Sequence, residues 1–251
     1  MQALGYEEYV TQGGDWGSII TRVMASEYGG KHVKAWHTNM PVAGPPPNDD
    51  PSKYDAEDLK ALERSKWFQN KGMGYFKQQS TQPQTIGYNL ADSPVGLLAW
   101  IYKKLMSWTD AYPWDDDEVL TWISIYWFSR SGPAASVRTY YEVGWTNLPT
   151  PSIPAGYSFF PKELGMGPKS WYNDPHVVFK PRHEHGGHFA AHERPVELVG
   201  DLRKMFGKGG PAYGVVAGKD GYGTSSETAG DSDGRLSKRR RLENDLPATE
   251  K

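Results

Sequence analysis

The chain has 251 residues, of which 37% are hydrophobic and 13% aromatic, so it can fill a substantial core. Its formal net charge of -2 gives no overall attraction to nucleic acid or to an anionic membrane. The lack of cysteine excludes disulfides, thiolate metal sites and cysteine catalysis, and no run approaches the roughly 20 apolar residues of a membrane span.

The first 41 residues predict a strand-helix-strand unit. A short apolar run, Tyr9-Val10-Thr11, ends near Asp15, and a helical pattern then continues to about Tyr28. Residues 33–38 read as a second strand. Such a unit implies a parallel sheet and therefore an α/β fold.

The segment between the first strand and the helix, Gly14-Asp15-Trp16-Gly17, has the form of a nucleophile elbow. Its central residue is an aspartate, whose ordinary pKa of about 3.9 makes it anionic at neutral pH without help from a base. An anionic carboxylate at this position points to displacement at a saturated carbon. The simpler interpretation, an aspartate that caps the next helix, remains open for the residue taken alone.

Residues 42–150 predict a helical lid inserted between sheet elements. A breaker-rich stretch at residues 41–51 is followed by helical patterns over about residues 56–142. Ser93 and Pro94 are typical of an N-cap and first helical position, and the acidic run at residues 115–117 is typical of a helix N-terminus. Most aromatic residues in this region are expected to form the lid core or an apolar pocket.

The sheet pattern returns at residues 157–160 and 176–179, and a final helix is predicted over residues 195–205. Glu163 follows the first of these strands, and His188 lies in a glycine-containing loop after the second. Loops at the carboxyl edge of a parallel sheet meet in space. The order nucleophile, acid, histidine therefore predicts that Asp15, Glu163 and His188 converge.

Residues 207–251 are rich in glycine, serine and charge, and are expected to be disordered because they cannot bury enough apolar surface. The basic run at residues 238–241 is typical of a nuclear localisation signal or an anion-binding patch. Glu243 and Asp245 beside it weaken that interpretation.

Several segments together resemble the epoxide hydrolases of the α/β-hydrolase fold, in their microsomal-type and fungal branch. The resemblance covers about residues 1–206. It is carried by the elbow around Asp15, Ser93-Pro94-Val95-Gly96-Leu97-Leu98-Ala99-Trp100-Ile101, Tyr126-Trp127, Phe159-Phe160-Pro161-Lys162-Glu163 and Gly186-Gly187-His188-Phe189-Ala190-Ala191. It implies a partial α/β-hydrolase core at residues 1–41 and 151–206, the lid at 42–150 and the tail at 207–251.

By that resemblance, Asp15 attacks an epoxide carbon and forms a covalent ester, while Tyr75 and Tyr140 donate protons to the epoxide oxygen. His188, oriented by Glu163, then activates the water that releases a 1,2-diol. The resemblance also assigns the backbone N–H of Trp16 to the oxyanion hole. Tyr141 is the alternative candidate for the proton donor assigned to Tyr140. Relatives carry earlier sheet strands and a His-Gly-x-Pro loop ahead of the elbow, so we expect a truncated chain with impaired activity.

Two further alternatives are a haloalkane dehalogenase and an inactive fragment that acts as a binding protein. The first also places a tryptophan after its aspartate, but it needs halide-binding groups where this lid offers tyrosines. A metal cluster of His183, Glu184, His185 and His192 lacks the His-Glu-x-x-His spacing. We expect an apolar epoxide and water as substrates, no cofactor, no nucleic acid, a cytoplasmic location with the nucleus left open by the basic run, and a homodimer as an open option.

Overall fold

The computed structural model describes residues 1–143 and 148–219. The predicted basic run at residues 238–241 lies outside these ranges. Within the described residues, four strands form one parallel sheet in the order β1-β2-β3-β4: β1 Tyr9–Gly13, β2 Val33–Thr38, β3 Ala155–Tyr157 and β4 Val177–Phe179. The prediction of an α/β fold with a parallel sheet is therefore confirmed.

The two faces of the sheet bury different apolar clusters. Ala25 of α1 (Trp16–Glu27) packs with Trp36 of β2 and Tyr157 of β3 on one face. On the other face, Ala35 of β2 packs against Met205 and its neighbours in α9 (Pro195–Phe206). Successive strand residues point to opposite faces of the sheet, so the alternation of buried residues fixes which of them face α1 and which face α9.

The third strand lies two residues earlier than the sequence predicts. Residues 155–157 pair with β2 and residues 155–156 with β4, whereas Phe159 makes only an isolated parallel bridge to Arg182. Phe159 and Phe160 are buried in spite of this, at 4% and 1% exposure. Both residues are apolar because they are buried, although they lie beyond the end of the strand. A short apolar run in a sequence does not show whether its buried residues belong to a strand.

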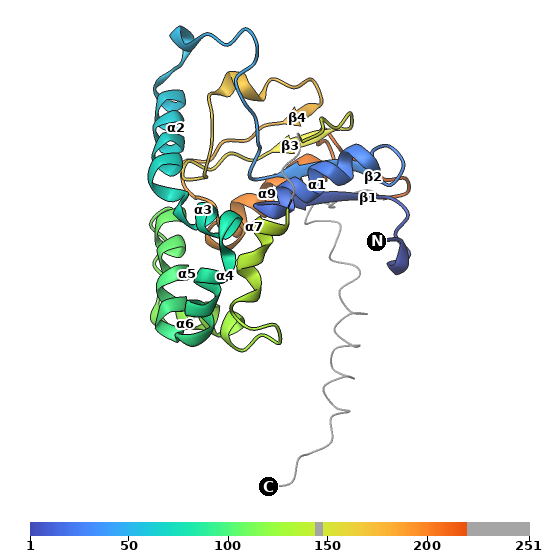
Figure 1. Cartoon of the computed structure of the whole chain (residues 1–251). Coiled ribbons are helices and arrows are strands. Elements are labelled where there is room, and N and C mark those ends of the chain that lie inside the picture. The colour runs from blue at the N-terminus through green and yellow to red at the C-terminus, as the bar shows by residue number, and fades with distance from the viewer. Residues whose placement is uncertain (144–147, 220–251) are drawn as a thin grey trace.

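The lid consists of short helices that gather to one side of the sheet (Figure 1). They are η2 Pro51–Lys53, α2 Ala56–Trp67, the π-helical turn η3 Phe68–Gly72, α3 Gly74–Thr81, α4 Pro83–Asp92, α5 Pro94–Trp108, α6 Asp116–Trp127, η4 Ala135–Arg138 and α7 Thr139–Glu142. The remaining helical segments are η1 Gln2–Leu4, η5 Lys169–Tyr172 and α8 Ala190–Glu193. No helix among the described residues is long and apolar enough to cross a membrane.

Capping side chains begin the lid helices where the sequence predicts. Ser93 accepts a hydrogen bond from the Gly96 N–H at 3.1 Å, with Pro94 in the first turn of α5. Asp115 accepts from the Glu118 N–H at 2.8 Å at the start of α6. Each bond satisfies a backbone donor that the first turn leaves without a helical partner.

Residues 207–219 differ from the prediction of a disordered tail beginning at 207. Ala212 is 1% exposed and packs with Ala35 and Met205 beneath the sheet. Its N–H donates to the Met205 carbonyl at 3.0 Å, and the Ala217 N–H donates to Glu8 at 3.3 Å. Ala212 and Val215 both pack in this cluster, so the segment buries apolar surface although residues 207–251 as a whole are rich in glycine, serine and charge.

Candidate active site

Asp15 occupies a strained turn between β1 and α1. Its backbone has φ 49° and ψ -128°, a conformation that non-glycine residues rarely adopt. The turn is tight because a Cβ at Gly13 would lie 2.2 Å from the Gly17 carbonyl oxygen. Glycine at position 13 therefore permits the close approach that projects the Asp15 side chain beyond the end of the strand.

The structure joins three of the predicted site residues in one chain of hydrogen bonds. His188 Nε2 lies 2.7 Å from Asp15 Oδ2, and His188 Nδ1 lies 2.6 Å from Glu163 Oε1. Glu163 is fully buried, and the side chain of His188 is 3% exposed. The Leu164 N–H also donates to Glu163 Oε1 at 2.6 Å, which fixes the carboxylate in the loop after β3.

The two carboxylates control the protonation of His188. Burial alone would lower its pKa, but the charge of Glu163 and the hydrogen bonds to Asp15 and Glu163 raise the pKa to about 10. Burial opposes ionisation of Asp15, yet its hydrogen bond with His188, the charge of His188 and the Trp16 N–H together lower its pKa. The site therefore holds an imidazolium between two carboxylates.

The Trp16 N–H donates to Asp15 Oδ1 at 2.5 Å. This donor comes from the first residue of α1, where backbone N–H groups and the helix dipole favour negative charge. Charge that develops on Oδ1 during a reaction at the carboxyl group would be stabilised by the same donor.

Tyr75 of α3 and Tyr140 of α7 lie together above the elbow. Their ring centroids are 5.6 Å apart, and the Tyr140 ring lies 5.4 Å from the Trp16 ring. Burial, Tyr140 and the Asp15 charge raise the pKa of Tyr75, while burial and the Asp15 charge raise that of Tyr140. Both phenols therefore keep their protons at neutral pH. Tyr141 instead is 56% exposed.

A cavity of about 590 Å³ contains Asp15, His188 and both tyrosines in its wall. Most of the rest of the wall is apolar or aromatic, from α1, α4, α5, α6, α8 and the loop before α8. These apolar and aromatic residues are Trp16, Leu90, Leu97, Trp100, Ile101, Leu105, Trp108, Trp122, Tyr126, Phe189 and Ala191. The arrangement places an anionic carboxylate and two phenol donors at one end of an apolar space.

The end of α5 holds the histidine loop in place. The His188 N–H donates to the Trp108 carbonyl at 2.8 Å, and the Asp110 carboxylate accepts from the Gly186 N–H at 3.0 Å. The Glu193 carboxylate in turn accepts from the N–H groups of Asp110 and Gly187, at 2.9 and 2.7 Å. The lid is therefore bonded directly to the loop that carries His188.

The histidines of the alternative metal cluster have separate partners. His183 Nε2 lies 2.6 Å from Asp201, and His192 Nε2 lies 2.7 Å from Glu118. Over residues 1–143 and 148–219, no group of three or more His, Cys, Asp or Glu side chains is placed to hold a metal ion.

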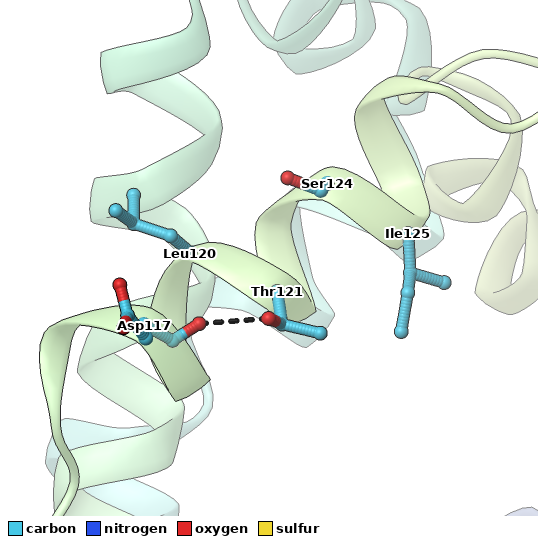
Figure 2. A pocket seen from close by; sticks show the side chains of 5 residues that line it. All are labelled: Asp117, Leu120, Thr121, Ser124 and Ile125. Carbon is cyan, nitrogen blue, oxygen red and sulfur yellow. Dashed lines mark hydrogen bonds between the residues drawn. The ribbon is translucent and has the colours of Figure 1, made fainter. Parts of the chain in front are cut away.

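A second hollow of about 680 Å³ lies on the lid surface but contains none of the site residues. Figure 2 shows its five lining side chains, all of which project from α6. The Thr121 hydroxyl is already satisfied by the Asp117 carbonyl at 2.8 Å. All of the lining side chains of this hollow come from one helix, and Asp117 is the one ionisable residue among the five.

Sequence reasoning missed Lys104, which lines the cavity, and it missed Asp110 and Glu193, which bond the histidine loop. Lys104 lies four residues after Trp100, a helical spacing that places both on one face of α5 and could have indicated a cation in the cavity wall. No local pattern identifies Asp110 or Glu193, because both bond backbone groups that come close only in the folded chain.

Comparison with known proteins adds an independent observation, although no family model matches the chain. A protein of Stigmatella aurantiaca provisionally classed as an epoxide hydrolase is 39% identical over 217 residues, covering 82% of this chain and 48% of that protein. Epoxide hydrolase 1 of Sus scrofa is 31% identical over 247 residues, covering 82% of this chain and 52% of that protein. The chain thus spans about half the length of these relatives.

The structure of Aspergillus niger epoxide hydrolase superimposes with a TM-score of 0.70 at 36% identity. The match covers 80% of this chain and 53% of that one.

Proposed function

This chain belongs to the epoxide hydrolases of the α/β-hydrolase fold, and we propose that it carries the machinery to open an epoxide to a 1,2-diol through a covalent ester at Asp15. The observation that carries this proposal is the hydrogen-bonded series Asp15, His188 and Glu163 at the end of a cavity that also holds two protonated tyrosines. An anionic nucleophile, a proton donor and a separate base are the groups that the two chemical steps require.

In the first step, the Asp15 carboxylate forms a bond to an epoxide carbon as the ring carbon–oxygen bond breaks. The departing oxygen takes a proton from the hydroxyl of Tyr75 or Tyr140, since an alkoxide is a poor leaving group without protonation. Proton donation by a positioned acid contributes roughly 10² to 10⁴ in rate. The raised pKa of both phenols supports this assignment because each holds its proton until the oxygen becomes basic.

Ester formation removes the negative charge of Asp15, one of the two carboxylates that raise the pKa of His188. His188 then gives up its proton more readily, and that proton restores the phenol. The neutral imidazole removes a proton from water as the water oxygen bonds to the ester carbonyl carbon. The Trp16 N–H stabilises the oxyanion. As the acyl–oxygen bond breaks, the departing alkoxide takes the proton of the new carboxyl group, which releases the diol and restores the Asp15 carboxylate beside protonated His188.

The proposed substrate is an epoxide with an apolar body, because apolar and aromatic side chains make up most of the cavity wall. The test is to incubate the purified protein with an aryl epoxide and to quantify the diol by chromatography. Asp15→Ala should abolish diol formation above the uncatalysed rate, whereas Asp92→Ala, at the exposed end of α4, should leave it unchanged. Equal diol formation by folded wild type and Asp15→Ala would contradict the proposal.

A further inference from the structure

The lid helix α5 carries a lysine whose ammonium group lies within the aromatic wall of the cavity. Lys104 Nζ lies 3.8 Å from the centre of the Trp100 ring and 5.5 Å from that of Tyr75. It donates one hydrogen bond, to the Trp100 carbonyl at 2.6 Å. The side chain is therefore held against the rings. Long cationic side chains at a surface usually extend their charged end into solvent instead.

Lys104 forms no ion pair with a carboxylate in the described part of the chain, in contrast to the histidines of the same wall. His188 contacts Asp15 and Glu163, and His192 contacts Glu118. A half-buried ammonium without a counterion is costly, and burial together with neighbouring Lys103 lowers its pKa to about 8. It remains charged at neutral pH, with two N–H donors beyond the one used by Trp100.

An adjoining cavity of about 490 Å³ shares Lys104, Tyr75, Trp100 and Trp108 with the main cavity. Among its described lining residues are two more lysines, Lys71 and Lys103, and no carboxylate. Lys104 therefore stands where the apolar reaction cavity meets a basic hollow. A ligand that extends from Asp15 through this junction would bring its far end to a positive potential.

We propose that Lys104 forms an anion subsite, and that the substrate is an epoxide whose apolar body ends in a carboxylate at the junction of the two cavities. The inference rests on the proposed function for the position of the epoxide ring. It adds the chemical class of the other end of the substrate. The carboxylate would receive charge-assisted hydrogen bonds from Lys104, while the aromatic rings around it exclude water.

The subsite can be tested by binding alone, without turnover. The probes are ω-phenylalkanoates with chains of about four to eight carbons and their neutral amides, titrated by calorimetry near pH 6.5. At the best length, we expect the acid to bind about tenfold more tightly than the amide, as charge-assisted hydrogen bonds allow. Lys104→Met should abolish the difference and Lys104→Arg should keep it. Lys60→Met, an exposed lysine of α2, is the matched control and should bind like the wild type.

The pH dependence separates Lys104 from the other charges, because an ammonium with a pKa of about 8 is charged below that pH and neutral above it. The wild-type preference for the acid should therefore fall between about pH 6.5 and 9.5, whereas that of Lys104→Arg should persist. The other titratable groups that line the two cavities are Asp15, Lys71, Tyr75, Lys103, Tyr126, Tyr140, His188 and His192. The contribution of these groups to the preference for the acid is measured in Lys104→Met at the same pH values.

Equal binding of acid and amide by the wild type, or an acid preference that survives in Lys104→Met, would overturn the subsite. If Lys104→Met does not fold, the comparison of wild type with Lys104→Arg across pH decides in the same way. Failure of the proposed function has a different signature. In that case the acid preference persists, but an aryl epoxide yields no diol that depends on Asp15.

Discussion

His188 Nε2 lies 2.7 Å from Asp15 Oδ2, although 173 residues separate the two in the sequence. The contact requires the β1 elbow and the loop after β4 to meet at one edge of the sheet. It also makes the proton on His188 depend on the charge of Asp15, since that carboxylate is one of the groups that raise the imidazole pKa. The proposed nucleophile and the proposed base are therefore electrostatically coupled.

Replacing Glu163 by glutamine should lower the pKa of His188 below about 10, because the charge of Glu163 is the largest contribution that raises it. The pKa can be followed by NMR titration of labelled histidine. Glu184→Gln, an exposed change in the histidine loop, should leave it unaltered. An unchanged His188 pKa in Glu163→Gln would show that the buried carboxylate does not hold the proton on the imidazole.

Replacing either lid tyrosine by phenylalanine should slow ester formation by roughly 10² or more, because the oxygen loses a proton donor. Single-turnover measurements on Tyr75→Phe and Tyr140→Phe would detect the loss in the first step. Tyr141→Phe is the matched control, since that side chain is 56% exposed and does not line the cavity. A rate for Tyr140→Phe equal to that of Tyr141→Phe would remove Tyr140 from the mechanism.

Glu193→Ala should loosen the histidine loop, because the carboxylate accepts from the N–H groups of both Asp110 and Gly187. We expect a loss of about 1 to 2 kcal/mol in the free energy of unfolding, as for hydrogen bonds to a charged acceptor that is partly exposed. Hydrolysis of the ester should slow more than its formation, because only the second step of the proposed mechanism uses His188 as a base. Glu184→Ala is the control for the loss of one negative charge. Equal slowing of both steps in Glu193→Ala would argue against a role specific to His188.

Acid should destabilise the fold through His37, which is fully buried and has its pKa lowered to about 4 by burial. A depressed pKa means that the unfolded chain binds the proton first. The stability that neutral His37 contributes is present above about pH 6.5 and falls as the pH drops toward 4. Urea unfolding across this range should show a weaker pH dependence for His37→Gln than for wild type. His176→Gln, at a side chain 42% exposed, should show the wild-type slope.

The elements that sequence reasoning predicted well are those with a local signal. The elbow glycines, the Ser93 cap and the acidic start of α6 each act within a few residues of their own position. The convergence of Asp15, Glu163 and His188 could be anticipated because parallel strands end at a common edge. Their roles in the reaction remain predictions.

The parts that could not be predicted depend on contacts between distant segments. The packing of Ala212 and Val215 beneath β2 could not be predicted from a glycine-rich segment, because these side chains complete a cluster whose other members lie far away in the sequence. The bonds from Asp110 and Glu193 to the histidine loop likewise use backbone donors, which leave no trace in the sequence. The lack of a carboxylate partner for Lys104 among the described residues depends on where the fold places the carboxylates.

The most direct test of the central claim is the intact mass of His188→Gln after incubation with an aryl epoxide. This variant keeps Asp15 but lacks the proposed base for ester hydrolysis, so the mass should rise by that of one epoxide and the adduct should map to Asp15. The double variant with Asp15→Ala should show no adduct. Absence of the adduct in folded His188→Gln, or its persistence without Asp15, would contradict the account.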